Sequence, residues 1–243
     1  MINPHRPILF AIVDPKTNFS SKYSHLSHHA YSFTGATKNS SNVESLWFFS
    51  HSSLLNVNVF NISEKSFTCD FIIDGTHSLC FFFYAKNRCH DRRPLLNDLT
   101  YLGTNINTPL FLIGDINSIL NTNEKIGPSH DPISTREFKT SIEDKNLVEI
   151  YLIVSKYAGY RRDYNRVVSS KLDRAFTNIP DFDKWDTISS ITLHMLHSYH
   201  HPSLVNVSIK NMIPSIPFKF NNVWFSNDEC TNIIKCFWSS MSH

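Results

Sequence analysis

Between residues 46 and 84 we interpret the short apolar segments as having a period of two, which is the period of a β-strand and not of a helix. Turn residues divide this stretch into four apolar segments, at residues 46–49, 57–62, 67–73 and 78–84. Asp74-Gly75 lies between the last two and is one of the strongest short-range signals for a β-hairpin. The stretch therefore predicts an antiparallel meander, around which the other elements must pack.

The remaining chain alternates between apolar strands and amphipathic helices. Residues 8–13 and 110–113 read as strands buried on both faces, the first stopped by Pro15 and the second ended by a turn at Gly114. Residues 204–209 alternate as a last strand. Residues 34–45 and 118–132 are predicted loops.

Four helices are predicted, and two of them open with a capping box. They lie at residues 20–29, at 92–102 with Pro94 in the first turn, after Ser134 and after Ser226. Strands at both ends of the chain with helices between them predict an α/β sandwich of two packed sheets.

Composition limits the class of protein. A chain of 243 residues with 41% hydrophobic and 18% charged residues can bury the core of one large domain or at most two. The net charge of +2 does not indicate a dedicated nucleic-acid binder, although basic clusters occur at residues 88–93 and 161–174. A solvated surface is the alternative explanation for each cluster. The longest apolar run, residues 79–85, is too short to span a bilayer, so we expect a soluble protein with no membrane partner.

The five cysteines contain no CxxC pair, and we interpret them as reduced thiols of an intracellular protein, most of them buried.

Polar residues with catalytic potential follow the apolar segments. They are Asp14, Tyr84, Asp115 with Asn117, Asp173, and His200 with His201. Ligands and catalytic groups tend to collect at strand ends in α/β folds. A carboxylate two residues from a carboxamide, as at Asp115 and Asn117, suits a hydrolytic site in which one group activates a water and the other positions it.

The order of these residues resembles the endonuclease/exonuclease/phosphatase superfamily, in particular the apurinic-type endonuclease domain of plant LINE-type (non-LTR) retrotransposons. The matching sequence segments are FLIGDINSILNTNE at 111–124, SKLDRAF at 170–176, FYA at 83–85, HSYHHP at 197–202 and FKFNNVW at 218–224. The resemblance implies a DNase I-like, four-layer α/β sandwich of two mostly antiparallel sheets flanked by helices. It places this domain at residues 1–212 and a linker and helix at 213–243, as between nuclease and reverse transcriptase.

The same resemblance implies a role for each site residue. Asp115 would orient and activate the attacking water, and Asn117 would help to hold that water and the phosphate. Tyr84 would donate a hydrogen bond to a phosphate oxygen, and His200, fixed by Asp173, would polarise the phosphate. Asp14 would be the ligand of Mg²⁺. DNA would be the partner, in the nucleus or cytoplasm, with contacts from Arg161, Arg162, Arg166, Lys171 and Arg174.

Several departures from the family predict a degenerate enzyme with little or no activity. Asp14, followed by Pro15, stands where the family has a metal-binding Glu, and Tyr199 stands where it has Asp. The family's first strand, with its asparagine, has no counterpart, which would leave a sheet edge or a core face uncovered. A non-catalytic nucleic-acid-binding remnant is the alternative function, and a small-molecule phosphoesterase is a third.

Overall fold

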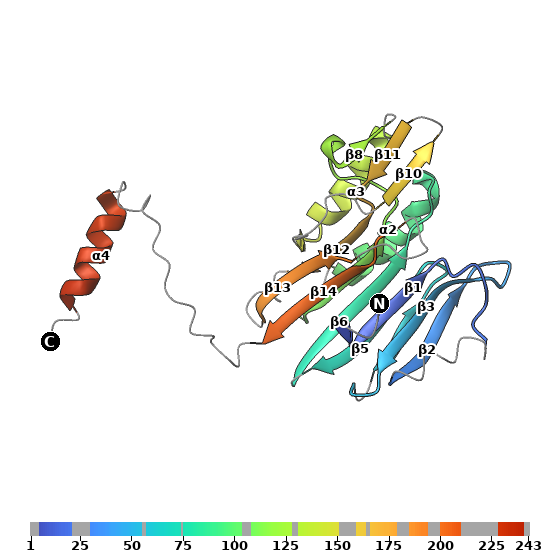
Figure 1. The fold of residues 1–243 in the computed structure, drawn as a ribbon, viewed down its shortest axis with the longest axis horizontal. Coiled ribbons are helices and arrows are strands. Elements are labelled where there is room, and N and C mark those ends of the chain that lie inside the picture. The colour runs from blue at the N-terminus through green and yellow to red at the C-terminus, as the bar shows by residue number, and fades with distance from the viewer. Residues whose placement is uncertain are drawn as a thin grey trace. The chain divides into compact units, whose positions relative to one another are not determined.

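The computed structural model describes residues 5–20, 30–54, 57–73, 75–103, 108–127, 131–150, 159–163, 166–178, 185–193, 200–209 and 228–240. The chain forms two compact units, Met1–Ile209 and Lys210–His243 (Figure 1). The larger unit contains every described strand, and the smaller one contains the helix α4 (Asp228–Ser240). None of the described helices is both long and apolar enough to cross a membrane.

The centre of the larger unit is a six-stranded mixed sheet. Its strands, in spatial order, are β4 (Asn58–Ile62), β5 (Ser66–Ile73), β6 (Thr76–Tyr84), β7 (Leu110–Asp115), β12 (Asp173–Asn178) and β9 (Leu147–Glu149). All neighbours are antiparallel except β6 and β7. That parallel pair requires a crossover, and α2 (Cys89–Gly103) supplies it.

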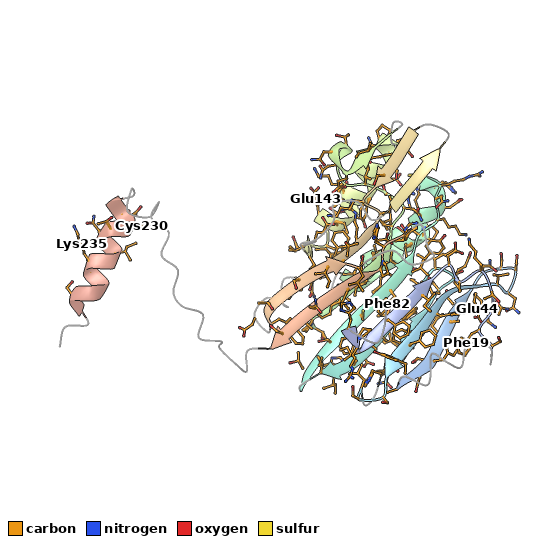
Figure 2. The ribbon with its side chains drawn as sticks, in the orientation of Figure 1. Phe19, Glu44, Phe82, Glu143, Cys230 and Lys235 are labelled. Carbon is orange, nitrogen blue, oxygen red and sulfur yellow. The ribbon has the colours of Figure 1, made fainter. Side chains whose placement is uncertain are left out.

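A second layer of strands covers one face of this sheet. It consists of a three-stranded sheet in the order β1 (Leu9–Val13), β3 (Glu44–His51), β2 (Tyr31–Lys38), and of a hairpin of β13 (Trp185–Thr192) and β14 (Ser203–Ile209). Aromatic side chains fill the space between the layers, where the ring of Phe48 lies 4.5 Å from that of Phe67 and 5.6 Å from that of Phe82. Figure 2 shows Phe82 within this interior.

The opposite face of the six-stranded sheet is covered by α2 and α3 (Pro132–Glu143). Phe81 and Phe83 of β6 pack there with Leu95 and Leu99 of α2 and with Phe138 of α3. Full burial of such side chains stabilises a fold by about 1.5–3 kcal/mol each. Successive side chains of β6 therefore contribute to both cores, because Phe81 and Phe83 face the helices and Phe82 faces the second strand layer.

A third cluster lies on the outer face of β1, β3 and β2. Phe19 stacks on Phe33 with 3.9 Å between the ring centroids. The buried carboxylate of Glu44 accepts hydrogen bonds of 2.6 Å from the backbone N–H of Phe19 and from Nε1 of Trp47. These bonds hold the chain after β1 against the sheet.

A small three-stranded sheet completes the larger unit, and its strand β11 ends just before β12 begins. It contains β10 (Gly159–Asp163), β11 (Arg166–Ser170) and β8 (Lys125–Ile126), and the short 3₁₀ helix η2 (Thr122–Glu124) leads into β8. The architecture confirms the predicted class, an α/β fold of packed antiparallel and mixed sheets flanked by a few helices.

Several local predictions were wrong. The predicted loop at 34–45 is shorter than expected, because β2 extends to Lys38 and β3 begins at Glu44, so that residues 39–43 alone connect the two paired strands. β3 belongs to the second layer and not to the meander, which begins at β4. β1 is a partly exposed edge strand and not a strand buried on both faces.

Helix and turn details also differ. α2 begins at Cys89, so Pro94 lies inside the helix and not in its first turn. α3 begins two residues before Ser134 and is capped by Asp131, whose side chain accepts a hydrogen bond from the N–H of Ile133. Gly114 continues β7 instead of ending it. The predicted helix at 20–29 and the capping box at Ser226 lie mostly outside the described residues.

Candidate active site

Three of the predicted site residues lie side by side on three neighbouring strands. Tyr84 of β6 is in register with Asp115 of β7, and Asp115 is in register with Asp173 of β12. Because β6 and β7 are parallel and β12 is antiparallel to them, the ends of the first two strands meet the start of the third. The sheet itself thus assembles residues that are distant in sequence.

A tight turn after β7 orients Asp115 and Asn117. The backbone N–H of Asn117 donates to Oδ1 of Asp115 (2.8 Å), and its side-chain amide donates to Oδ2 (3.2 Å) and to the carbonyl of Ala85 (2.8 Å). Asn117 has a φ of 51°, a left-handed conformation that asparagine tolerates better than most residues. Arg92 of α2 donates to the carbonyl of Asn117 (2.7 Å) and so anchors the turn.

His200 and Asp173 form the second part of the site. Nδ1 of His200 lies 2.8 Å from Oδ2 of Asp173, a distance at which a protonated Nδ1 donates to the carboxylate. This hydrogen bond raises the pKa of His200 to about 9, against an opposing effect of burial. His200 is therefore an imidazolium at neutral pH.

Asp115 interacts electrostatically with both Asp173 and His200 and is 4% exposed. Burial, followed by the negative charge of Asp173, raises the pKa of Asp115 to about 7, and the N–H of Asn117 opposes that rise. A carboxyl group with such a pKa exchanges protons readily at neutral pH, which suits a general base.

Tyr84 and Asp14 form the third part. The hydroxyl of Tyr84 donates to Oδ2 of Asp14 over 3.2 Å. Burial and the nearby Asp14 raise the pKa of Tyr84 to about 12, so the phenol stays protonated and remains a donor. The same oxygen of Asp14 is paired with the ammonium of Lys16.

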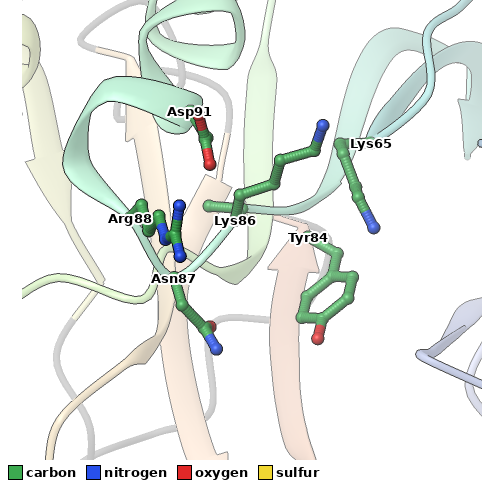
Figure 3. Close-up of a pocket in the computed structure, with 7 residues that line it drawn as sticks. Lys65, Tyr84, Lys86, Asn87, Arg88 and Asp91 are labelled. Carbon is green, nitrogen blue, oxygen red and sulfur yellow. The ribbon is translucent and has the colours of Figure 1, made fainter.

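A pocket of about 270 Å³ opens beside Tyr84 (Figure 3). Lys65, Lys86 and Arg88 contribute positive charge to it, and Asp91 contributes one carboxylate. The ammonium of Lys65 lies 4.6 Å from the centre of the Tyr84 ring, and burial lowers the pKa of Lys65. Lys86 is also paired with Glu64 (3.3 Å). The net charge of this pocket favours an anion next to the phenol.

Two positions offer carboxylate ligands for a metal ion. Ligand atoms of Asp115, Asp173 and His200 lie within 4.8 Å of one another. Asp173 is engaged by the imidazolium of His200, and Asp115 resists ionisation. The side chain of Asp14 is 34% exposed, and a hard cation such as Mg²⁺ commonly uses one or two carboxylates together with substrate oxygens. Asp14 therefore fits a magnesium ligand, in competition with Lys16.

The basic residues predicted to contact nucleic acid separate into three groups. The Arg174 side chain is 0% exposed and pairs with Glu124 and, at 2.8 Å, with Glu149, so the prediction that it contacts nucleic acid is wrong. Lys171 pairs with Glu149 over 2.8 Å. Arg161, Arg162 and Arg166 belong to β10 and β11, but their side chains lie outside the described part, as does the whole of Tyr199.

Sequence reasoning missed the residues that support the site. Lys16, Arg92 and Glu124 each contact or anchor a site segment. Lys16 carried a usable signal, since it lies two residues from the predicted metal ligand. Arg92 and Glu124 carried none, because their partners are 25 and 50 residues away.

This arrangement of sheets and helices is the fold of endonuclease/exonuclease/phosphatase family proteins. Among solved structures, the chain is similar to the endonuclease domain of TRAS1, a telomere-specific non-LTR retrotransposon. That likeness has a TM-score of 0.66 at 10% identity and covers 86% of this chain and 90% of that one.

Two further structures have the same fold. The catalytic domain of human Nocturnin with a bound sulfate anion matches with a TM-score of 0.55 at 16% identity, over 85% of this chain and 83% of that one. TDP2 from D. rerio, complexed with a single-strand DNA product, matches with a TM-score of 0.53 at 10% identity, over 82% and 83%. No protein-family model and no curated protein matches the chain.

Proposed function

We propose that this chain carries the site of a metal-dependent nuclease that hydrolyses phosphodiester bonds in DNA, with weak activity. The observation that carries the proposal is the row formed by Tyr84, Asp115 and Asp173, with His200 hydrogen-bonded to Asp173. The nuclease-type folds of the TRAS1 endonuclease domain and of TDP2 support it. The motif text at 111–124 favours an origin in a plant LINE-like element.

The charges of the site suit phosphodiester hydrolysis. A water held by Asp115 and Asn117 attacks phosphorus and gives a proton to the Asp115 carboxylate, while the bond to the leaving oxygen breaks and that oxygen takes a proton from solvent. The His200 imidazolium donates to a phosphate oxygen on which negative charge develops, and the Tyr84 phenol donates to another after its hydroxyl turns from Asp14 to the phosphate. Asp173 keeps His200 protonated and fixes its orientation.

Mg²⁺ held by Asp14 would neutralise charge on the phosphate. Two features of Asp14 support weak activity. Its side chain is one methylene shorter than glutamate, and Lys16 already pairs with the carboxylate that would bind the ion. The site would thus retain most of its donors and its base while binding its metal weakly.

Nicking of supercoiled plasmid DNA in the presence of Mg²⁺ tests this proposal. We expect slow nicking by the native chain, and a loss of about 10²-fold or more in the Asp115→Asn and His200→Gln variants. Asp144→Asn and His77→Gln are matched controls, because they make the same chemical changes away from the site, His77 lying near the opposite end of β6 from Tyr84. Equal nicking by all five proteins would contradict the proposal.

A second candidate, nucleic-acid binding without hydrolysis, is favoured by the basic pocket beside Tyr84. Affinity for a DNA duplex that falls with salt, and whose salt slope decreases by about one when Lys65 is replaced by Ala, would support it. Binding with no nicking at any Mg²⁺ concentration would select this candidate. Hydrolysis of a small phosphomonoester, with none of an abasic duplex, would instead select a small-molecule phosphoesterase.

A further inference from the structure

The guanidinium of Arg92 is buried between three segments of the larger unit. Arg92 lies in the first turn of α2 and is 4% exposed. Its Nη1 donates to the carbonyls of Asn117 (2.7 Å), Asn87 (2.8 Å) and Lys86 (3.3 Å). Its Nη2 donates to the hydroxyl of Ser134. Neutral oxygen atoms therefore accept all four of these hydrogen bonds.

The shape of the guanidinium holds these acceptors in a fixed arrangement. An ionised group leaves water at a large cost unless hydrogen bonds replace its hydration, and here backbone carbonyls supply most of them. The group is planar and presents its N–H donors in a rigid fork, unlike the flexible ammonium of a lysine. Arg92 therefore fixes the positions of the bound segments relative to one another.

Two of these segments belong to the candidate active site. One is the loop between β6 and α2, in which Lys86 and Asn87 line the basic pocket (Figure 3). The other is the turn after β7, which contains Asp115 and Asn117. Arg92 is thus bonded both to the loop beside which an anion would bind and to the turn that would hold the attacking water.

Direct hydrogen bonds between the loop and the turn are all made at Ala85. Its N–H donates to the carbonyl of Asp115 (2.8 Å), and its carbonyl accepts from the side-chain amide of Asn117 (2.8 Å). Attachment at one residue leaves the turn free to pivot there. Arg92 adds a second attachment through Asn87, so the orientation of the turn is fixed as well as its distance from the loop.

The third segment is the start of α3. The Oγ of Ser134 accepts a hydrogen bond from Arg92 and lies 2.7 Å from the Oγ of Ser118. Both serines are buried, and Ser118 directly follows Asn117 in the chain. The turn is consequently held from α2 through the Asn117 carbonyl and from α3 through Ser118.

We propose that Arg92 is a positioning residue of the candidate active site. It holds the turn with Asp115 and Asn117 in a fixed orientation to the loop that lines the basic pocket. This role rests on the proposed function, because it concerns the same hydrolytic reaction. The buried guanidinium acts through the turn and not on the substrate, and it sets the direction from which the water approaches phosphorus.

The packing of α2 does not depend on Arg92. Leu95, Leu96 and Leu99 of the helix are buried against the six-stranded sheet, together with Phe81 of β6. A variant at Arg92 should therefore keep α2 in place and lose the bonds between the loop and the turn. This difference separates a positioning role from support of the whole fold.

Hydrogen exchange in the full-length chain reports on the turn without depending on activity. In the Arg92→Met variant, we expect the amide of Asn117, which donates to Asp115, to exchange about tenfold faster or more. The amide of Leu79, at the opposite end of β6, is the internal control and should be unaffected. Arg93→Met is the matched control variant, because Arg93 is the exposed neighbour of Arg92.

The kinetics of plasmid nicking test the consequence for the reaction. Arg92→Met should lower kcat about 10²-fold, as a misplacement of about 1 Å does. KM should change less than about threefold, because Lys65 of the pocket comes from the turn between β4 and β5. Arg92→Lys should recover about tenfold of the loss in kcat, because an ammonium supplies donors without the fork. Arg93→Met should keep the native constants.

The two measurements separate this role from the proposed function. If the native chain does not nick DNA, the proposed function fails, and exchange at Asn117 still decides whether Arg92 holds the turn. If the native chain nicks DNA and Arg92→Met keeps the native kcat or raises KM alone, the positioning role is overturned and the function stands. Unchanged exchange at Asn117, or equal acceleration at Asn117 and Leu79, also overturns it.

Discussion

At the scale of single residues, two neighbouring ionisable groups have raised pKa values for different reasons. Burial disfavours the Asp115 carboxylate, whereas the hydrogen bond to Asp173 favours the His200 cation. Between about pH 7 and about pH 9 the site therefore holds a carboxylate base together with an imidazolium donor. This combination of charges suits the phosphodiester hydrolysis proposed for this site.

The first prediction concerns pH. We expect kcat/KM for plasmid nicking to rise as Asp115 loses its proton up to about pH 7, and to fall as His200 loses its proton above about pH 9. Asp173→Asn removes the hydrogen bond that raises the pKa of His200, so the alkaline limb should move to lower pH. A pH–rate profile checks this, and an alkaline limb that stays in place would contradict the role of Asp173.

The second prediction concerns Lys16, whose ammonium occupies the Asp14 carboxylate. Lys16→Met removes the competing charge, so half-maximal nicking should require less Mg²⁺. The side chain of Lys16 is 79% exposed, and such a pair contributes at most about 1 kcal/mol, which limits the change to about fivefold. A titration of activity with Mg²⁺ measures it, with the exposed Lys139→Met as the control. An unchanged or higher requirement would show that Lys16 does not compete.

At the scale of elements, the contact between β6 and β7 depends on Gly114. A Cβ at Gly114 would lie 2.0 Å from the carbonyl oxygen of Phe83, which no side-chain rearrangement can relieve. We expect Gly114→Ala to lower the free energy of unfolding by about 3 kcal/mol, measured by urea denaturation. Gly35→Ala is the matched control, because a Cβ there meets no atom within 4 Å. Equal stability of the two variants would contradict this reading of β7.

Arg174 connects β12 to the segments on either side. Its buried guanidinium pairs with Glu124 and Glu149. The central carbon of the guanidinium lies 5.6 Å from the centre of the Phe138 ring of α3. Arg174→Met leaves Glu124 buried without a counter-ion, which should destabilise the chain by about 3–5 kcal/mol in urea denaturation.

A companion Glu124→Gln substitution should restore part of that loss. The exposed pair of Arg93 and Glu137 provides the control, since Arg93→Met should change stability little. If Glu124→Gln in the Arg174→Met background lowers stability further, the buried charge is not the cause.

The sequence predicts strands and helices well where their period is clear, and it fails where pairing partners decide. The apolar run at residues 79–85, placed after the hairpin signal at Asp74-Gly75, is enough to identify β6, whereas β2 lies partly in a segment that reads as a loop and is held by β3. Gly114 was predicted to end its strand in a turn. The glycine is required instead by the close approach of the Phe83 carbonyl on the neighbouring strand β6, and the sequence does not show which strands are neighbours. The residues at strand ends were predictable as candidates, but their register was not.

At the scale of the whole molecule, the described core belongs to the larger unit. All members of the three apolar clusters precede residue 209. We therefore expect a chain truncated after Ile209 to keep its cooperative unfolding, with a midpoint in urea close to that of the full chain. The predicted boundary at 212/213 can be checked by limited proteolysis, and a truncated chain that fails to fold cooperatively would contradict this division.

The separation in sequence between residues that contact each other also affects the order of events during folding. The Tyr84–Asp14 bond joins residues 70 positions apart, and the His200–Asp173 bond joins residues 27 positions apart and depends on β12 being in place. Closing long loops slows folding, whereas the β5–β6 hairpin forms from neighbouring residues. The hairpin should therefore form early and the ionisable groups should meet last, so recovery of activity should lag behind recovery of secondary structure in a refolding experiment.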